Sequence, residues 1–583
     1  MSEKGVAGVS PEERCAIGIS FGNSYSSIAC TIDDSPVVIA NEDGDRQIPT
    51  ILSYVDGEEY TGNQAKALLV RNPKNTVVAF KDFLGQEYAS LDSTFWPSID
   101  NMNSYKSIDP THCHAASHPE DKNGAVSFTI QDKVEGEPST VSVSDISTRY
   151  LRRLVQSASD YIGKKVTSAV VTVPTNFSEK QRDALIKAAQ EADLEILQLI
   201  NEPIASVLAY DARPEAKLED KTIVVADLGG TRSDVAVVAS RGGLFTLLAT
   251  AHDYEYAGAQ LDKVLMDHFA KEFMKKNANV DPRENARSLA KLKAESEATK
   301  KALSIGTNAN FSVESLAEGI DFQMTINRLR YETISRKVFE GFNRLVEGVV
   351  KKAGLDVLDI DEVILSGGTS HTPRIASNLR SIFPETTTVL APSTSPSALN
   401  PSELQARGAA LQASLIQEYE SEDIDQSTHP AVTTVKHISN AVGVLTLSED
   451  GETFTPIIAP ETAVPARRTV HVEAPKDGGN VLVKVVEGGT HIKVTKPEPK
   501  PKENGEKGDD EDEDSDFDSE EEEEEHREKI WKIGSTLAEA AVKDVKKGGK
   551  VEVTITVASD LSVTITAREV SGKGGVRGTL RAP

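Results

Sequence analysis

The chain has 583 residues, which is enough for three or four domains of ordinary size and for at least one large buried core. It contains no window of eighteen or more apolar residues, and residues 1–14 are small, polar and charged, so neither a membrane span nor a signal peptide is expected. Its three cysteines, Cys15, Cys30 and Cys113, are too few and too unevenly spaced for a disulfide framework or a zinc site. This cysteine usage favours a reducing, cytoplasmic compartment.

The net charge of −27 is unevenly distributed. Fourteen of the seventeen residues from Asp509 to Glu525 are Asp or Glu, so this one tract holds about half of the excess negative charge. A run that repels itself and contains one apolar residue, Phe517, cannot bury enough surface to become ordered. We therefore expect a disordered acidic insertion, or alternatively an electrostatic arm for basic surfaces. Direct nucleic-acid binding is not expected, because phosphate contacts need clustered Lys and Arg.

Strands and helices alternate over residues 15–416. Strand-like runs occur at 15–31 and 166–173, and Ser178 is a candidate N-cap for a helix that continues to Asp193. Further strands are expected at 222–226 and 362–365, and a long charged helix is expected at 285–303. This alternation predicts an α/β architecture, preceded by a flexible N-terminus at 1–14.

The chain changes character after residue 416. Residues 417–435 are polar and predict a linker. Short β-prone runs then predict a small all-β domain from 436–495 and 530–573, with strands at 442–447, 468–472, 481–486, 551–557 and 561–567. A Pro-Lys spacer and the acidic tract interrupt this domain at 496–529, and a tail follows at 574–583. No helical bundle is expected after the last strand.

Three loops that follow strands combine glycine with small polar residues. Glycine allows the backbone to approach an anion, while N–H groups and short hydroxyl side chains donate to its oxygens. Taken alone, each loop is more often an ordinary tight turn, so only their order and spacing favour phosphate binding. The candidate residues are Gly22, Asn23, Ser24 and Tyr25, then Gly229, Gly230 and Thr231, then Gly367, Gly368 and Thr369.

The order of these motifs resembles that of the DnaK-type seventy-kilodalton heat-shock protein family. Ile17-Gly-Ile-Ser-Phe-Gly-Asn-Ser is similar to the family's first phosphate loop, Gly-Ile-Asp-Leu-Gly-Thr-Thr. The resemblance implies an α/β, actin-like, two-lobed ATPase domain followed by a small, lidless all-β domain. The other matching motifs are Asn75-Thr76 with Lys81, Val171-Thr-Val-Pro-Thr-Asn-Phe, Ile200-Asn-Glu-Pro-Ile-Ala-Ser, Asp227-Leu-Gly-Gly with Asp234, residues 297–304 and Ser366-Gly-Gly-Thr.

The resemblance also implies a role for each matching residue, with ATP as the cofactor, with or without Mg²⁺. Lys81 would lie near the transferred phosphate, Glu202 near the attacking water, and Asp227 near the waters of the magnesium ion. No further metal site is expected, because the histidines around Cys113 lie in a polar loop. The nucleoside would be held by Glu297, Lys300, Lys301 and Ser304, and by Gly367, Gly368, Thr369 and His371.

This chain departs from the family pattern around the phosphates. Ser20 stands where the family has Asp, so a carboxylate that helps to hold the metal is missing. In the second loop the family reads Gly-Gly-Gly-Thr-Phe-Asp, and here Thr231 and Arg232 replace a glycine and the phosphate-proximal threonine. Nearer the adenosine, His371 replaces an arginine and Ser402 replaces an aspartate.

These departures predict a retained ATP pocket with little or no hydrolysis. Phosphoryl transfer depends on positioning and charge neutralisation, in which metal ions are prominent. The chain is then not an enzyme, and its vestigial catalytic residues are Lys81, Glu202, Asp227 and Asp234.

Two interpretations of Arg232 are open at this point. Its guanidinium could reach the terminal phosphates as a fixed cation, or it could point to solvent or pair with a neighbouring acid. In either case the threonine hydroxyl is lost, and a static cation favours bound ATP as much as its transition state.

The all-β region resembles a reduced peptide-binding domain of the family, without the helical lid and with acidic residues 418–423 in place of the apolar interdomain linker. This combination resembles an atypical fungal branch of the family that pairs stably with the J-domain protein zuotin in the ribosome-associated complex. The resemblance implies a cytoplasmic co-chaperone for cotranslational folding. Its partners would be a J-domain protein in a stable heterodimer, the ribosome through that protein, and a separate, active heat-shock chaperone.

Two alternatives belong to other classes. Lys81, Glu202, Asp227 and Asp234 are compatible with an active chaperone ATPase that has an unusual metal site. The other is a heat-shock-type nucleotide-exchange factor, which also carries an acidic insertion, but its long helical extension is not expected after Lys573.

Overall fold

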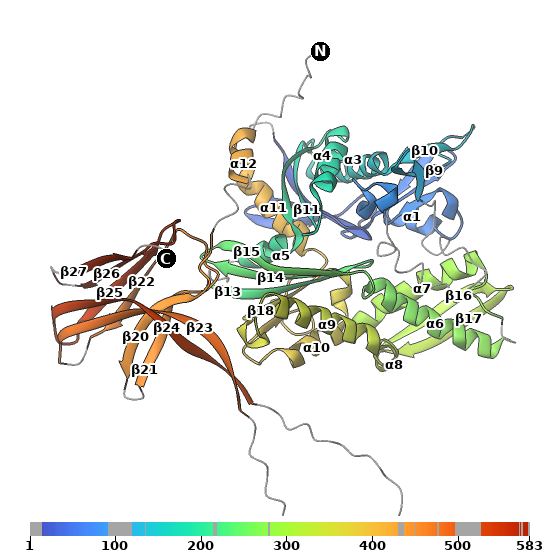
Figure 1. The fold of residues 1–583 in the computed structure, drawn as a ribbon. Coiled ribbons are helices and arrows are strands. Elements are labelled where there is room, and N and C mark those ends of the chain that lie inside the picture. The colour runs from blue at the N-terminus through green and yellow to red at the C-terminus, as the bar shows by residue number, and fades with distance from the viewer. Residues whose placement is uncertain are drawn as a thin grey trace, which may run out of the picture. The chain divides into compact units, whose positions relative to one another are not determined.

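The structure is a computed structural model that describes residues 14–90, 119–134, 136–213, 219–277, 280–428, 436–448, 451–474, 477–495, 526–570, 572 and 575–580. The chain divides into two compact units, residues 1–434 and 435–583, each considered by itself (Figure 1). The region around Cys113 and the acidic tract at 509–525 lie outside the described residues. Within the described part of the chain, no helix combines the length and the apolar character needed to cross a bilayer.

The first unit contains two large sheets with the same strand order and directions. In each sheet, two strands that follow in antiparallel succession lie on one side of a central strand, and two strands parallel to it lie on the other. The strands of the first sheet run in the order β12 (Glu195–Asn201), β11 (Ser168–Val173), β1 (Ala16–Phe21), β2 (Tyr25–Ile32) and β3 (Ser35–Ile39), with β4 (Ile48–Pro49) beside β2. The second sheet runs β15 (Leu244–Asp253), β14 (Ser233–Arg241), β13 (Lys221–Leu228), β18 (Glu362–Ser366) and β19 (Thr388–Leu390).

Two helices exchange partners between these sheets. Helix α5 (Glu202–Asp211) follows β12 of the first sheet, but its Val207 and Tyr210 pack on strands of the second. Helix α11 (Leu404–Ile416) follows β19 of the second sheet and packs on the first. The two helices cross in direct contact, because a Cβ at Gly408 would lie 1.8 Å from the carbonyl oxygen of Ala205. Each lobe is therefore tied to the other by a helix.

The remaining helices cover the sheets and close two separate cores. Phe21, Phe80 and Tyr150 lie in the core of the first lobe, whereas Phe269 stacks on Phe311 in the core of the second. The covering helices are α3 (Val143–Ile162) and α4 (Glu179–Glu191) in the first lobe, and α6 (Gly258–Lys276), α7 (Ala286–Ile305), α8 (Arg328–Ile334), α9 (Arg336–Lys352) and α10 (Pro373–Ile382) in the second. Smaller elements are α1 (Gly62–Leu68), β5 (Ile51–Val55), β6 (Glu58–Thr61), β7 (Thr76–Val78), β8 (Pro119–Lys122), β9 (Ala125–Ile130), β10 (Ser139–Ser142), β16 (Asn308–Ala317) and β17 (Ile320–Asn327).

The predicted helix starts agree with the structure. Ser178 caps α4 in a capping box with Gln181, and Asn285 accepts hydrogen bonds from the first N–H groups of α7. Such caps depend on a few adjacent residues, so they are visible in the sequence.

The second unit is built from two four-stranded sheets that enclose one apolar core. The described residues of this unit contain no helix, as expected for an all-β domain. One sheet has the order β21 (Gly451–Ile458), β20 (Ala441–Ser448), β23 (Gly479–Thr495) and β24 (His526–Val545). The other has the order β22 (Ala466–Glu473), β25 (Lys550–Val557), β26 (Val563–Glu569) and β27 (Gly575–Leu580).

Four predicted boundaries differ from the structure. Within the predicted linker 417–435, residues Ser421–Thr428 form helix α12, whose Ile424 is buried against the first lobe. Arg14, assigned to a flexible N-terminus, is buried and donates to Glu195, to the Ser421 hydroxyl and to the carbonyl oxygen of Tyr419. The predicted insertion 496–529 ends earlier, because β24 begins at residue 526, and β27 occupies most of the predicted tail 574–583.

Strand β24 is the largest element absent from the sequence-based assignment. Its run of Ala, Glu and Lys has helix-forming composition, yet it pairs antiparallel along β23 from Thr495↔His526 to Gly479↔Val545. Pairing with a distant strand overrides local propensity here, as is common for strands.

Candidate nucleotide site between the two lobes

The three glycine loops contact one another where the two lobes meet. The Asn23 side-chain amide donates to the Thr231 hydroxyl at 3.1 Å, and the Thr369 hydroxyl donates to the carbonyl oxygen of Gly229 at 2.8 Å. A Cβ at Gly230 would lie 2.5 Å from the Ser24 hydroxyl oxygen, so this close approach requires glycine. The loops predicted from the sequence are therefore brought together at the carboxyl ends of β1, β13 and β18.

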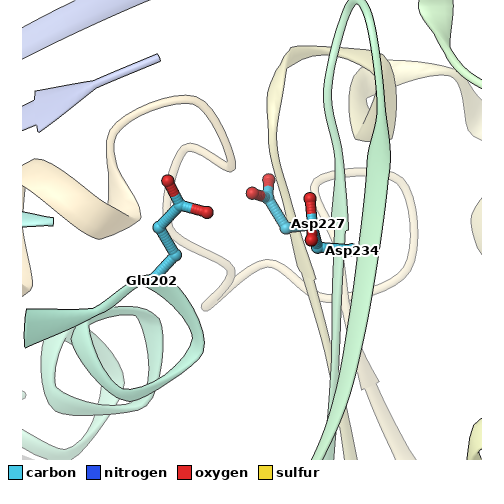
Figure 2. Close-up of side chains that lie close together, drawn as sticks. All are labelled: Glu202, Asp227 and Asp234. Atoms are coloured by element: carbon cyan, nitrogen blue, oxygen red, sulfur yellow. The ribbon is translucent and has the colours of Figure 1, made fainter. Parts of the chain in front are cut away.

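Three carboxylates meet beside these loops. Glu202 is the first residue of α5, while Asp227 on β13 and Asp234 on β14 are directly paired across the sheet. One carboxylate oxygen from each residue lies within 4.8 Å of the others, and the close-up shows the three side chains converging (Figure 2). Burial raises the pKa of Asp227 to about 7, with further contributions from the charges of Glu202 and Asp234, and burial also raises the pKa of Glu202.

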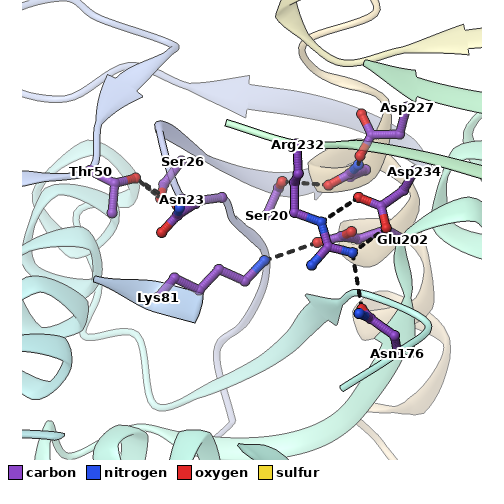
Figure 3. Close-up of polar contacts among 12 residues, drawn as sticks. Ser20, Asn23, Ser26, Thr50, Lys81, Asn176, Glu202, Asp227, Arg232 and Asp234 are labelled. Atoms are coloured by element: carbon purple, nitrogen blue, oxygen red, sulfur yellow. Dashed lines mark hydrogen bonds and ion pairs between the residues drawn. The ribbon is translucent and has the colours of Figure 1, made fainter. Parts of the chain in front are cut away.

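Two cations from opposite lobes pair with two of these three acids (Figure 3). The Lys81 Nζ lies 3.0 Å from Glu202 Oε1 with both side chains almost fully buried. Arg232 donates to both carboxylate oxygens of Asp234, to the Tyr254 hydroxyl at 3.0 Å and to Asn176 Oδ1 at 3.0 Å. Of the two interpretations of Arg232, pairing with a neighbouring acid is the arrangement observed. Burial opposes its charged form, but Asp234 holds the pKa of Arg232 well above its usual range.

A glutamine joins the two sheets across the same cleft. The Ser20 hydroxyl on β1 donates to Gln405 Oε1 at 2.9 Å, and Gln405 Nε2 donates to Asp227 Oδ2 at 2.7 Å. Gln405 lies on α11, near the crossing with α5. The position that carries an aspartate in the family pattern is thus occupied here by a neutral hydroxyl in an amide bridge.

The residues predicted to hold the nucleoside gather on α7 and form a bridge to the first lobe. The Tyr25 hydroxyl donates to Glu297 Oε1 at 2.6 Å and accepts from Lys301 at 2.7 Å and from Lys66 at 2.6 Å. Lys66 on α1 also lies 2.8 Å from Glu297. Although burial opposes it, the charges of the lysines hold the pKa of Glu297 far below its usual range. This cluster connects α1 and the first glycine loop of the first lobe with α7 of the second.

The other nucleoside candidates are held by neighbouring groups. Lys300 lies 2.8 Å from Asp262 and donates to the carbonyl oxygen of Gly258, while the Ser304 hydroxyl donates to the carbonyl of Lys300. His371 Nε2 lies 3.0 Å from the Ser402 hydroxyl, and burial lowers the pKa of this imidazole. These pairs fix the side chains that would surround adenine and ribose.

Several residues of the site were not singled out in the sequence. Asn176 belongs to the motif Val171-Thr-Val-Pro-Thr-Asn-Phe, so its contribution to the site could have been predicted from the sequence. Gln405 and Lys66 carry no local signal, because each acts through a partner far away in the sequence. Tyr254 reaches Arg232 from 22 residues further along the chain.

Comparison with known proteins agrees with this geometry. Residues 16–497 match the Hsp70 protein family. A heat shock protein 70 homolog of Schizosaccharomyces pombe is 43% identical over 584 residues, covering 99% of this chain and 98% of that protein. The ribosome-associated complex subunit SSZ1 of Saccharomyces cerevisiae is 42% identical over 565 residues, 97% of this chain and 99% of that protein. Heat shock 70 kDa protein 14 of Danio rerio is 30% identical over 474 residues, 81% of this chain and 88% of that protein.

The family match spans most of the chain, and two fungal relatives align with it over nearly their whole length. It agrees with the two-lobed α/β unit, the glycine loops and the all-β unit. The chain therefore belongs to the Hsp70 protein family, which confirms the resemblance identified from its motifs.

Proposed function

We propose that this chain is an Hsp70-type co-chaperone that binds ATP, hydrolyses it little or not at all, and acts on the ribosome with a J-domain partner. The nucleotide would be held by the glycine loops, with its adenosine between α7 and the loop at 367–371. In this proposal the bound ATP stabilises the two-lobed unit as a scaffold.

A single observation carries the proposal: Arg232 occupies both carboxylate oxygens of Asp234 beside an otherwise retained phosphate site. Because each oxygen of Asp234 already accepts from this fixed cation, the carboxylate is less available to orient an attacking water or the shell of a metal ion. Glu202 and Asp227 each have one oxygen bonded as well, to Lys81 and Gln405. The groups that could orient water are thereby engaged with the protein itself.

We expect binding without turnover because the two cations of the site, Lys81 and Arg232, are held in fixed positions. Lys81 and Arg232 are held in ion pairs with Glu202 and Asp234 before any nucleotide arrives, so they keep the same positions in the ground state and in the transition state. Only interactions that strengthen in the transition state accelerate a reaction, and fixed cations of this kind strengthen binding equally in both states.

The test is the fate of ATP during and after purification. The full chain should retain intact ATP, and a single-turnover experiment with labelled ATP should show no conversion to ADP over many minutes. Rapid multiple turnover stimulated by a J-domain would contradict the proposal and favour an active ATPase, for which the converging carboxylates are the structural argument.

The partner assignment rests on similarity to a protein named as a subunit of the ribosome-associated complex. We infer that this chain forms a stable heterodimer with a J-domain protein, reaches the cytoplasmic ribosome through it, and supports a separate, active chaperone during cotranslational folding. The all-β unit offers edge strands such as β24 and β27, to which a partner segment could add.

Affinity purification of the tagged full chain should recover a J-domain protein at equal stoichiometry together with ribosomes. Truncation after Thr428 removes the all-β unit but keeps α12, whose Ile424 is part of the first unit's core. This truncation should abolish partner recovery, and unchanged recovery would move the interface to the nucleotide unit. Binding should not depend on nucleotide state.

A further inference from the structure

We propose that Gln405 is a positioning residue of the nucleotide site, which joins the two lobes beside the glycine loops and slows the release of ATP. This inference rests on the proposed ATP binding and goes one step further, because it assigns a residue that controls how long the nucleotide is retained. It is carried by the place of one amide side chain between the two large sheets.

The helix that carries Gln405 is fixed to the first lobe. A Cβ at Gly18 of β1 would lie 2.1 Å from the backbone nitrogen of Ala410, so α11 lies directly on this strand. The Thr31 hydroxyl of β2 also donates to the carbonyl oxygen of Ala410 at 3.0 Å. Because α11 is held so closely to β1 and β2, Gln405 moves with the first lobe.

The Gln405 side chain reaches from this helix to the second lobe. Its Oε1 accepts from the Ser20 hydroxyl of β1 at 2.9 Å, and its Nε2 donates to Asp227 Oδ2 of β13 at 2.7 Å. An amide offers an acceptor and a donor at once, so it can join a hydroxyl to a carboxylate. The bond to Ser20 orients the amide within the first lobe, and the bond to Asp227 crosses to the second.

This bridge contacts the ends of two strands that lead into glycine loops. Ser20 precedes Gly22 of the first loop by two residues, and Asp227 precedes Gly229 of the second loop by two residues. The third loop packs on the other carboxylate oxygen of Asp227, because a Cβ at Gly367 would lie 2.5 Å from Oδ1. The relative positions of the three loops therefore depend on the bridge.

Loss of the bridge should favour separation of the lobes. A nucleotide held between the loops of two lobes leaves after those loops have moved apart, and that movement breaks the bond between Gln405 and Asp227. Without the amide, a half-buried carboxylate oxygen lacks its donor while the lobes are together, which destabilises the closed arrangement relative to the open one.

The experiment measures the release of a fluorescent ATP analogue from the full chain by stopped-flow displacement with excess ATP. Methionine has about the length of glutamine but no amide, so Gln405→Met should release the analogue roughly tenfold faster than wild type. The matched control is Gln412→Met, because Gln412 also lies on α11 and donates to Gln198 Oε1 at 2.8 Å within the first lobe. The control should release the analogue at the wild-type rate.

The outcomes separate this inference from the proposed function. Equal release rates for Gln405→Met and wild type overturn the inference and leave the proposed function standing. An equal acceleration in Gln412→Met would assign the effect to the stability of α11 and would also overturn the inference. A wild-type chain that binds no ATP overturns the proposed function, and the inference with it.

The variant Ser20→Ala distinguishes a positioning role from a general contribution to stability. It removes the hydroxyl that orients the Gln405 amide, and release should become about threefold faster. Because Ser20 acts through Gln405, the double variant Ser20→Ala/Gln405→Met should release the analogue no faster than Gln405→Met alone. Accelerations that multiply in the double variant would contradict the bridge.

Folding of each variant is checked by its melting temperature. Gln405→Met and Gln412→Met each remove one amide from α11, so we expect similar decreases in melting temperature but different release rates. If Gln405→Met unfolds too readily for kinetics, Ser20→Ala alone tests the bridge, and release at the wild-type rate would overturn it.

Discussion

The two sheets of the nucleotide unit place different chemistry at equivalent positions. Ser20 of β1 pairs with Ser27 of β2, whereas Asp227 of β13 pairs with Asp234 of β14. One sheet thus presents hydroxyls to the cleft and the other presents carboxylates. The repeated topology positions both sets alike, so the difference in charge arises from side chains alone.

This difference between the sheets determines which groups can neutralise the acids of the site. Among the described residues of this site, the carboxylates come from the second sheet and from Glu202 of α5. Two of these acids pair with fixed cations, Glu202 with Lys81 and Asp234 with Arg232. Each prediction below changes one member of this arrangement.

Removal of the Lys81 ammonium should cause the largest loss of stability. In Lys81→Met the Glu202 carboxylate stays buried beside two other acids without its cation. Breaking one partner of a buried ion pair costs about 3–5 kcal/mol, which calorimetry of the nucleotide unit would measure. The control Lys180→Met removes an exposed lysine paired with Glu87 and should change the stability by less than about 1 kcal/mol. Similar melting of both variants would show that the buried pair contributes little.

The variant Ser20→Asp, which gives both sheets a carboxylate at equivalent positions, should cause the second largest loss of stability. The new carboxylate would adjoin Gln405 and lie in the same cleft as Asp227, so we expect a loss of roughly 2 kcal/mol in the nucleotide-free chain. Ser20→Asn has the same size without the charge and serves as the control. If both variants lose the same stability, side-chain size rather than charge is responsible. Addition of Mg²⁺ should stabilise Ser20→Asp more than wild type.

The stability of the chain should depend on pH through Asp227 of β13. The pKa of Asp227 is raised from 3.8 to about 7 in the folded chain, so between these values the folded state binds more protons than the unfolded state. Its contribution to stability is therefore fully present below pH 3.8 and is lost as the pH rises through 7. A shift of about 3 units corresponds to roughly 4 kcal/mol at most, and partial exposure of Asp227 lowers this value.

The variant Asp227→Asn keeps an acceptor for Gln405 and removes the titrating charge. Its melting temperature should exceed that of wild type at pH 8 and approach it near pH 4. Asp425→Asn, at an exposed position on α12, should follow wild type at every pH. Parallel pH profiles for Asp227→Asn and wild type would contradict the assignment.

Local signals in the sequence predicted much of this architecture. The capped starts of α4 and α7, the order of the glycine loops and the all-β character of the second unit each depend on residues close together in the chain. The pairing of Arg232 with Asp234 is also local, because Arg232 lies just before β14 and only two residues from Asp234.

The contacts that the sequence did not predict join residues far apart in the chain. Lys81 and Glu202 are 121 residues apart, and Gln405 is 385 residues from Ser20. Neither contact leaves a trace in spacing or composition. Strand β24 was missed for the same reason, since its pairing with β23 replaces the helix that its composition favours.

The smallest expected effect follows from substituting Tyr25, which links α7 of the second lobe to the first lobe. Tyr25→Phe removes a hydroxyl that donates to Glu297 and accepts from Lys66 and Lys301, but it leaves the ion pairs of Glu297 intact. The loss should be about 1 kcal/mol, typical of one hydrogen-bonding group in a polar cluster, and should appear as release of ATP accelerated about fivefold. Because this cluster links the two lobes, weakening it should speed their separation and with it the release of the nucleotide. The control Tyr60→Phe removes an exposed hydroxyl bonded to Glu58 in the same lobe and should leave the release rate unchanged. Stopped-flow displacement of a fluorescent ATP analogue measures both rates, and equal rates for Tyr25→Phe and the control would show that the carboxylate and lysines alone hold the lobes together here.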